Sequence, residues 1–492
     1  MNNINSQQRR AFHPLPPAYD SPATDKTSSI CRAARRRASR QSRRAVYERG
    51  KSVDGAVNLS TGEYAIARIP GHDVCHRVGC FGAHGVLPGS GGELMRGAAL
   101  PVLWLCGPPG VGKTTVAWEM YSHLMQAGIE TAVVDIDQLG ICYPEPAADP
   151  GRHRMQARNL DAVAAAFRAA GARCLIVSGV VDTARGVHVG EIPRAAVTVC
   201  RLRADRDELR QRFTSRGEPA ELVDHVLREA DVLDASTFAD ACVDTSGLSV
   251  NEVAWLVRER TRGWPTPTQG CSADADEPTA AAAVTTPDRS QASAQTVPMA
   301  AGPVLWLCGA TGVGKSTVGF EVYQRVLRAG VTAAYIDLDQ LGFCHPVPHD
   351  DPGNHRVKSR NVAAVWGTYR AAGAQCLIMT GPVENEVAVK AYADALPAAE
   401  LTLCRLHAER EQLTKRIKLR GRGGGSWAQP GDPLRGQSVT RLLQIADQAV
   451  ASDAALEDAG IGDLRIDTDA HTVEQVADAL VAQVALPGLR SP

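Results

Sequence analysis

Residues 101–120 read PVLWLCGPPGVGKTTVAWEM, and residues 303–322 read PVLWLCGATGVGKSTVGFEV. The two stretches are identical at 14 of 20 positions, at an offset of 202 residues. The same offset relates Asp135 to Asp337, and further matches follow in the segments beyond. A repeat of this length is a whole domain rather than one unit of a solenoid. The sequence therefore predicts two copies of one domain.

Each copy alternates short apolar runs with stretches of helical periodicity. In the first copy we expect strands at 102–106, 131–135, 174–178, 197–202 and 241–243. Helices are expected at 113–127 and 156–170, with a last helix that Ser249 opens. Continuous apolar strands between helices are typical of a parallel sheet that is covered on both faces. The predicted fold class is α/β, with a mostly parallel, doubly wound sheet in each of two tandem domains.

Both copies contain the pattern G-x-x-x-x-G-K-[ST] between an expected strand and an expected helix. Its glycines let successive backbone N–H groups turn toward phosphate oxygens, and the helix that follows presents its positive N-terminus to the same anion. The lysine reaches the outer phosphates, and the hydroxyl residue after it ligates Mg²⁺. The pattern therefore predicts two P-loop NTPase domains that bind ATP and Mg²⁺. The predicted nucleotide-binding residues are Gly107, Gly110, Gly112, Lys113, Thr114 and Thr115 in the first copy, and Gly309, Gly312, Gly314, Lys315, Ser316 and Thr317 in the second.

Two carboxylates follow the second expected strand of each copy, and they belong to Asp135 and Asp137 and to Asp337 and Asp339. The carboxyl edge of a parallel sheet is where ligands bind. There, one carboxylate can hold Mg²⁺ while the other accepts a proton from an acceptor hydroxyl. Capping of the turn is the alternative interpretation. The predicted metal ligands are Thr114, Asp135, Ser316 and Asp337, and the predicted catalytic groups are Lys113, Asp137, Lys315 and Asp339.

Arginines complete the predicted sites. Two of them lie four residues apart in each copy, hence on one helical face, and favour an anionic acceptor, with a solvated helix face as the alternative. A third follows the fourth strand, where a mobile lid would bring positive charge onto the transferring phosphoryl group; a surface charge run is the alternative. The predicted substrate-binding residues are Arg154, Arg158, Gly179, Arg356, Arg360 and Gly381, and the predicted catalytic lid residues are Arg212 and Arg416.

Composition excludes several classes of protein. The 492 residues are 44% hydrophobic and 22% charged, with a net charge of −1, which is ordinary for a globular protein. We expect no membrane contact, because no apolar run is long enough to span a bilayer and the first ten residues lack the apolar core of a secretory signal. The 13 cysteines are expected to be reduced thiols in the cytoplasm, with Cys106 and Cys174 buried in the core.

The remaining segments differ from the repeats in composition. We predict a disordered basic tail at 1–50, an irregular Gly-rich segment at 51–98, the first domain at 99–262, a Pro/Ala/Thr-rich linker at 263–301 and the second domain at 302–487. The tail holds ten Arg and could contact nucleic acid, although we favour a plain disordered tail. A His/Cys cluster at 72–84 matches no standard zinc finger, and we favour coincidence there.

At these motifs the sequence resembles the P-loop small-molecule kinases, a group that includes shikimate, gluconate and adenylylsulfate kinases. The Asp-x-Asp after the second strand is similar to the shikimate kinase pattern. This resemblance implies that Asp135 and Asp337 bind the metal, while Asp137 and Asp339 contact the acceptor hydroxyl. It also implies that Gly179 stands where shikimate kinases have a Gly-rich turn against the substrate.

The predicted function is that of a Mg-ATP-dependent kinase that phosphorylates a hydroxyl of a small anionic metabolite. Two alternatives remain at this point. The first is a regulatory P-loop protein that hydrolyses or senses ATP without a metabolite acceptor, and the second is a nucleotide monophosphate kinase. The sequence identifies neither the acceptor nor the oligomeric state.

Overall fold

The computed structural model describes residues 99–215, 220–262, 264–265, 301–424 and 434–489. The basic tail, the Gly-rich segment with its His/Cys cluster and most of the linker therefore lie outside the described residues. Residues 97–492 fall within one compact unit. None of the described helices has the length and apolar character needed to cross a bilayer.

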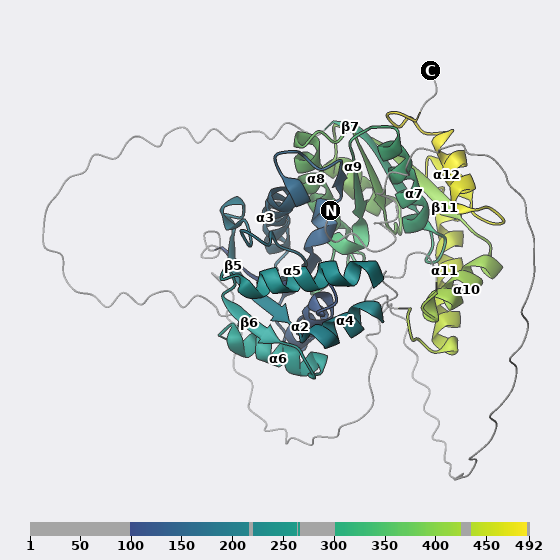
Figure 1. Ribbon diagram of the computed structural model, residues 1–492. Helices are drawn as coiled ribbons and strands as arrows, with labels where there is room; N and C mark the ends of the chain where they lie inside the picture. Colours follow the sequence, from purple (N-terminus) through teal and green to yellow (C-terminus); the bar gives the residue numbers. More distant parts are fainter. Residues whose placement is uncertain (1–98, 216–219, 263, 266–300, 425–433, 490–492) are drawn as a thin grey trace, which may run out of the picture. The chain divides into compact units, whose positions relative to one another are not determined.

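The first domain is a parallel sheet with helices on both faces (Figure 1). Its own strands lie in the order β6-β5-β1-β4-β2, all parallel. The strands are β1 (Leu100–Cys106), β2 (Thr131–Asp135), β4 (Cys174–Ser178), β5 (Ala195–Arg203) and β6 (Ala241–Asp244). The helices are α2 (Lys113–Gln126), α3 (His153–Ala169), α4 (Arg206–Thr214), α5 (Val223–Ala235) and α6 (Val250–Arg260), and a 3-10 turn, η1 (Ile136–Gly140), follows β2.

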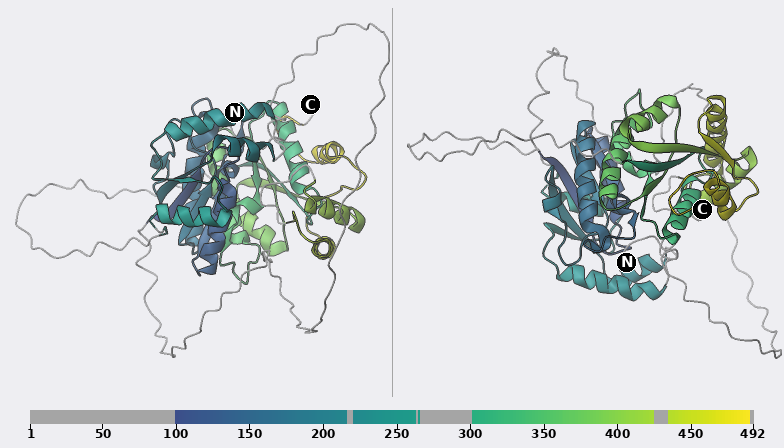
Figure 2. Two further views of the ribbon diagram at one scale, coloured as in Figure 1. Left: turned by 60° about the horizontal axis from the view of Figure 1, so that its bottom comes forward. Right: turned by 90° about the horizontal axis from the view of Figure 1, so that it is seen from above.

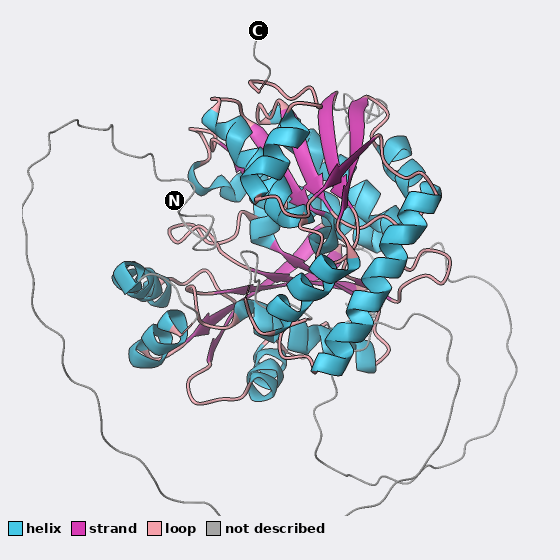
Figure 3. Cartoon of the chain, turned by 90° about the vertical axis from the view of Figure 1, so that its right-hand side faces the viewer, coloured by secondary structure: helices cyan, strands magenta, loops and turns pink. Residues whose placement is uncertain are grey.

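The second domain repeats this order as β12-β11-β7-β10-β8. Its strands are β7 (Gly302–Cys308), β8 (Ala333–Asp337), β10 (Cys376–Thr380), β11 (Ala399–His407) and β12 (Leu464–Asp467). Its helices are α7 (Lys315–Arg328), α8 (His355–Ala371), α9 (Glu386–Ala395), α10 (Arg410–Gly421), α11 (Val439–Asp458) and α12 (Val473–Val481), and the turn η5 (Leu338–Leu341) follows β8. Figure 3 shows the strands in magenta between helices in cyan, as the predicted α/β class requires.

The two domains exchange a short strand. β3 (Cys142–Tyr143) leaves the first domain and pairs antiparallel with β8 of the second, while β9 (Cys344–His345) leaves the second domain and pairs antiparallel with β2 of the first. Two further backbone hydrogen bonds extend the pairing, from Val133 N to Phe343 O (3.0 Å) and from Tyr335 N to Ile141 O (2.9 Å). Each exchanged strand thus covers a sheet edge whose N–H and C=O groups need partners.

The two domains also share one hydrophobic core. Helices α3 and α8 pack against each other, as labelled in Figure 1. One cluster of buried side chains combines Trp104 and Phe167 of the first domain with Trp306, Trp366 and Tyr392 of the second. In Figure 2 the first domain is blue to teal and the second is green to yellow. The sequence predicted the two copies but not this shared interior.

Local sequence explains where several elements begin. The last helix of the first domain opens at Ser249, whose hydroxyl caps Glu252 N while the Glu252 side chain accepts from Ser249 N. This capping box satisfies N–H groups that have no partner inside the helix. Cys106 and Cys174 are buried core residues, as predicted, and the described cysteines are all free thiols.

Candidate functional site

Each P-loop lies between the first strand of its domain and the helix that follows. Lys113 Nζ donates hydrogen bonds to the carbonyl oxygens of Gly107 (2.8 Å) and Pro108 (3.1 Å). Lys315 makes the matching bonds to Gly309 O (2.9 Å) and Ala310 O (3.0 Å). The two loops therefore share one geometry, with the lysine folded across the loop that precedes it.

Glycine is required at the first position of the loop. Gly107 has φ +145°, and a Cβ placed on it would lie 2.3 Å from the carbonyl oxygen of Leu202. Gly309 repeats this with φ +128° and a 2.4 Å approach to Leu406 O. A side chain at either position would collide with backbone, so the P-loop curvature depends on these glycines.

The first carboxylate of each pair faces the hydroxyl that follows the P-loop lysine. Ser316 Oγ donates to Asp337 Oδ2 (3.4 Å), and the hydroxyl of Thr114 faces Asp135 in the first domain. Burial raises the pKa of Asp135, and the pKa of Asp337 rises to about 7 through burial and the charge of Asp339. Hydroxyl and carboxylate oxygens are the hard ligands that Mg²⁺ binds, and these pairs fit that ion.

The second carboxylate of each pair differs between the domains. Burial, followed by the charge of Asp135, raises the pKa of Asp137 to about 8. In the second domain, Lys358 Nζ lies 3.0 Å from Asp339 Oδ1 and donates a hydrogen bond to it. The matching residue in the first domain is Gln156, which is neutral. The pairs are thus alike in position but not in their counter-charges.

Both domains carry a lysine whose charge is disfavoured by its surroundings. Burial lowers the pKa of Lys113, and the carboxylates of Glu229 and Asp137 oppose this effect. Burial also lowers the pKa of Lys315, with Asp339 as the strongest opposing charge. Glu229 lies on α5 and was not predicted from the sequence.

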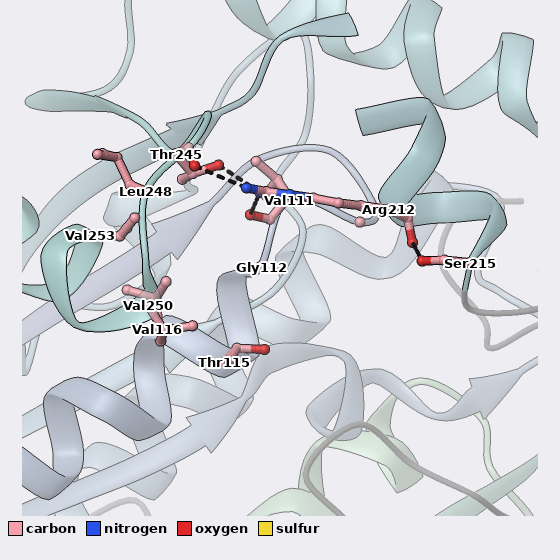
Figure 4. Close-up of a pocket in the computed structure, with 11 residues that line it drawn as sticks. Val111, Gly112, Thr115, Val116, Arg212, Ser215, Thr245, Leu248, Val250 and Val253 are labelled. Carbon is pink, nitrogen blue, oxygen red and sulfur yellow. Dashed lines mark hydrogen bonds between the residues drawn. The ribbon is translucent and has the colours of Figure 1, made fainter. Parts of the chain in front are cut away.

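A pocket of about 290 Å³ adjoins the first P-loop (Figure 4). Arg212 forms part of its wall by donating to Val111 O (3.3 Å), Thr245 Oγ1 (2.8 Å) and Thr245 O (2.9 Å). The pocket is lined by Gly110, Val111, Gly112, Thr115, Val116, Arg212, Ser215, Thr245, Leu248, Val250 and Val253. Its mostly apolar lining suits the flat nucleobase of a nucleotide, since ligand pockets are mostly apolar with a few placed polar groups.

The structure places the predicted lid residue Arg212 in this wall and gives Arg416 the equivalent contacts in the second domain. Arg416 repeats the bonds of Arg212, to Val313 O (3.1 Å), Thr468 Oγ1 (2.8 Å) and Thr468 O (2.9 Å). Each guanidinium group therefore ties its helix to the P-loop and to the loop after the last strand. Action on the transferring phosphoryl group remains a prediction for both residues.

The predicted substrate arginines lie on the surface. Arg154 and Arg158 both pair with Glu191, at 2.6 and 2.8 Å, and are about half exposed. Arg356 pairs with Asp350 at 2.7 Å, and Arg360 is exposed. The structure thus brings the first two together on one carboxylate, while an acceptor role for any of the four stays a prediction.

Gly179 and Gly381 lie at the carboxyl ends of β4 and β10, beside the carboxylate turns. A Cβ on Gly179 would lie 2.3 Å from Ile136, and one on Gly381 would lie 2.6 Å from Leu338. These glycines let β4 and β10 approach the turns that carry the carboxylate pairs. Their contact with substrate stays a prediction.

Sequence reasoning missed the polar residues that open the helix after the carboxylate turn. Arg152 is 6% exposed and precedes α3, and its counterpart in the second domain is Asn354. His355 is buried and hydrogen-bonds to Glu384 and to Tyr392 Oη (3.2 Å). The two copies read GRHRMQ (151–156) and GNHRVK (353–358). Comparing them shows that the first copy has its cation at Arg152, where the second has Asn354, and that the second has its cation at Lys358, where the first has Gln156.

Among the described residues, no group of three or more His, Cys, Asp or Glu side chains is arranged to hold a metal ion. The fit to Mg²⁺ therefore rests on one carboxylate and one hydroxyl per domain. Such a sparse ligand set is usual for this ion, which keeps several waters and takes further ligands from substrate phosphates.

Residues 103–232 match the family model described as an AAA domain, while no curated protein matches the chain. Among solved structures, the tunicamycin resistance protein of Deinococcus radiodurans is 25% identical, over 33% of this chain and 95% of that one, with a TM-score of 0.26.

Two kinases are similar over 34–37% of this chain. The shikimate kinase of Bacteroides thetaiotaomicron is 14% identical over 37% of this chain and 97% of its own, with a TM-score of 0.26. The APS kinase of Mycobacterium tuberculosis is 18% identical over 34% of this chain and 99% of its own, with a TM-score of 0.23. Residues 103–232 are thus similar to an AAA domain.

Proposed function

We propose that this chain is a Mg-ATP-dependent kinase that transfers the γ-phosphoryl group of ATP to a hydroxyl of a small anionic metabolite. The observation that carries the proposal is the second carboxylate, Asp137 or Asp339, two residues beyond the carboxylate that faces the P-loop hydroxyl. A metal-binding carboxylate serves many ATP-binding proteins. A second carboxylate beside it suits a group that accepts the proton of a hydroxyl nucleophile.

The transfer needs one proton acceptor and one neutralising group per site. The carboxylate of Asp137 takes the proton of the acceptor hydroxyl, whose oxygen then bonds to the γ-phosphorus. The bond from that phosphorus to the bridging oxygen breaks, and ADP leaves with the electron pair. Lys113 stabilises the charge on the phosphate oxygens, and Mg²⁺, when bound, neutralises part of the same charge.

The surroundings of Asp137 suit this role. A general base works best when its pKa lies near the operating pH, because it must both take up and release a proton. Burial and the charge of Asp135 bring the pKa of Asp137 to about 8, far above that of a free aspartate. A cation bound beside Asp135 would counter that negative charge and return part of Asp137 to its ionised form.

The experiment is an ADP-release assay with Mg-ATP, run with and without pools of hydroxylated anionic metabolites. Stimulation by one pool is the expected result, and it would also narrow the acceptor. Flat, slow turnover that no pool changes would reject the kinase and favour an ATP-sensing regulator. Lys113→Ala and Lys315→Ala, alone and together, assign turnover to each domain; independent sites predict additive losses.

A further inference from the structure

Each domain buries one cation at the start of the helix that follows its carboxylate turn, but at different positions. The first domain has Arg152, directly before α3, and the second has Lys358, in the first turn of α8. The positions that match them are Asn354 and Gln156. A positive charge has therefore moved by four residues between two otherwise matching segments.

The guanidinium group of Arg152 is buried without full hydrogen bonding. The residue is 6% exposed, and its Nε and Nη1 atoms have no hydrogen-bond partner among the described residues. Its Cζ lies 3.9 Å from the centre of the Tyr143 ring. Stacking on an aromatic ring occupies the face of a guanidinium group and leaves free the N–H donors in its plane, which are the ones that bind carboxylate or phosphate oxygens.

The surroundings of Arg152 come from both domains and include the candidate base. Asp137 of the first domain and Tyr323 and Tyr369 of the second lie within electrostatic reach of its charge. The exchanged strand β3 supplies Tyr143. Arg201 and Arg405 also bury an Nε and an Nη1 without a hydrogen-bond partner among the described residues, so it is the place of Arg152, within electrostatic reach of Asp137, that sets it apart. A buried donor without a partner calls for a specific explanation, such as a catalytic role or a bound ion.

The second domain satisfies the corresponding donor groups internally. Asn354 Nδ2 donates to Gly342 O (3.0 Å) and to Cys344 O (3.1 Å), while Lys358 Nζ donates to Asp339 Oδ1 (3.0 Å). Neither side chain leaves its donor group as unpartnered as Arg152 does. The difference between the two copies thus concentrates on one guanidinium group, which has two nitrogen atoms unpartnered in the described part of the chain and lies within electrostatic reach of Asp137.

We propose that the first domain takes an acceptor with a carboxylate or phosphate group near its hydroxyl, that Arg152 binds this group, and that the second domain does not bind it in this way. This inference rests on the proposed kinase function and names the chemistry of the acceptor at one of its two sites. It also makes the interface between the domains part of the acceptor site, because the ring under Arg152 belongs to the exchanged strand.

Arg152→Asn tests the proposal with little risk to folding. Arg152 has φ +60°, and Asn354 occupies the same place in the second domain with φ +52°. Asparagine tolerates this left-handed conformation, so the substitution removes the guanidinium group and keeps the backbone. Arg152→Lys retains a cation without the planar donors. Arg173→Met is the matched control, because Arg173 is 58% exposed and precedes β4, at the edge of the sheet opposite the carboxylates.

Binding is measured by calorimetry on the full chain saturated with Mg-ADP. The probes are glycerate, glycerol 3-phosphate and glycerol, which share a hydroxylated three-carbon skeleton and differ in their charged group. We expect at least one anionic probe to bind and glycerol not to bind. Arg152→Asn should weaken that binding at least tenfold, Arg152→Lys by less, and Arg173→Met by less than twofold.

Three results would overturn the proposal: no binding of either anion, equal binding of glycerol, or unchanged affinity in Arg152→Asn with its thermal unfolding intact. The ADP-release assay separates this failure from that of the proposed function. Stimulated release that Arg152→Asn leaves unchanged would retain the kinase and reject the role of Arg152. If anion binding depends on Arg152 but no pool stimulates ADP release, the role of Arg152 would be retained and the kinase function rejected.

Discussion

Phe343 is the side chain through which the strand exchange is most directly tested. It belongs to the second domain, yet its ring packs edge-to-face on Trp118 of the first, with centroids 4.6 Å apart, and its carbonyl accepts from Val133 N. If the exchange joins the domains into one cooperative unit, Phe343→Ala should destabilise both of them. The reciprocal variant is Ile141→Ala, whose side chain is 9% exposed and packs in the core of the second domain.

The expected cost follows from these contacts. Loss of the aromatic pair costs about 0.5–1.5 kcal/mol, and the remaining half-buried apolar surface raises the total for Phe343→Ala to about 2 kcal/mol. Ile141→Ala removes a buried side chain and should cost about 2–4 kcal/mol. With an unfolding entropy of about 2.1 cal/mol/K per residue over the pair of domains, 2 kcal/mol lowers Tm by roughly 2–3 °C.

Differential scanning calorimetry of the full chain checks this prediction. We expect one transition that both variants shift downward, with no effect from the control Val387→Ala, whose side chain is 78% exposed. The reasoning would be refuted by two separate transitions, one for each domain, if each variant shifted only the transition of the domain that carries the substitution. An unchanged Tm in both variants would also refute it, because the exchanged strands would then contribute nothing to stability.

Three further predictions concern single sites. Gly107→Ala should abolish nucleotide binding at the first site, measured by calorimetry in a Lys315→Ala background, because its Cβ would meet Leu202 O; wild-type affinity would contradict this. Lys358→Gln should raise the pKa of Asp337 above about 7, since a nearby positive charge is lost. The acid limb of the second site's pH–rate profile should then move to higher pH, and an unmoved limb would exclude this electrostatic role. Glu191→Gln should destabilise by less than about 1 kcal/mol at pH 7, because exposed pairs are weak. Hydrogen bonds from Arg158 and Arg154 lower the pKa of Glu191 to about 2, so its stabilisation is present above the unfolded pKa of about 4.3 and lost as the pH falls toward 2. Urea unfolding of the wild type and of Glu191→Gln at pH 7 and near pH 2 tests this prediction. An equal difference in the free energy of unfolding at the two pH values would contradict it.

The sequence predicted the elements whose pattern is local. Strands β2 and β4 have the expected bounds, and α2 begins at Lys113 as expected, because continuous apolar runs and the P-loop pattern mark them. The capping box at Ser249 was likewise visible in the chain. Such signals depend only on neighbouring residues, so one sequence is enough to find them.

The strand exchange and the buried cations could not be predicted in the same way. Cys142–Tyr143 and Cys344–His345 are two residues long, too short for any periodicity, and their partners lie in the other copy. The hydrogen bonds of Arg212 to Val111 O and Thr245 could not be predicted either, because a helix rich in Arg suits a lid as well as a pocket wall. Whether Arg152 is buried depends on rings from a domain about 170 residues away in the chain, which no local pattern encodes.

The exchange has a mechanical consequence. Because each half lends a strand to the sheet of the other, the polypeptide between residues 265 and 301 is not the only connection between the halves. A protease cut in that stretch would break the covalent connection and leave two fragments that migrate as one particle until they are denatured. Each half therefore completes the other's open edge, and a substitution in one borrowed strand is felt in the sheet of the opposite copy.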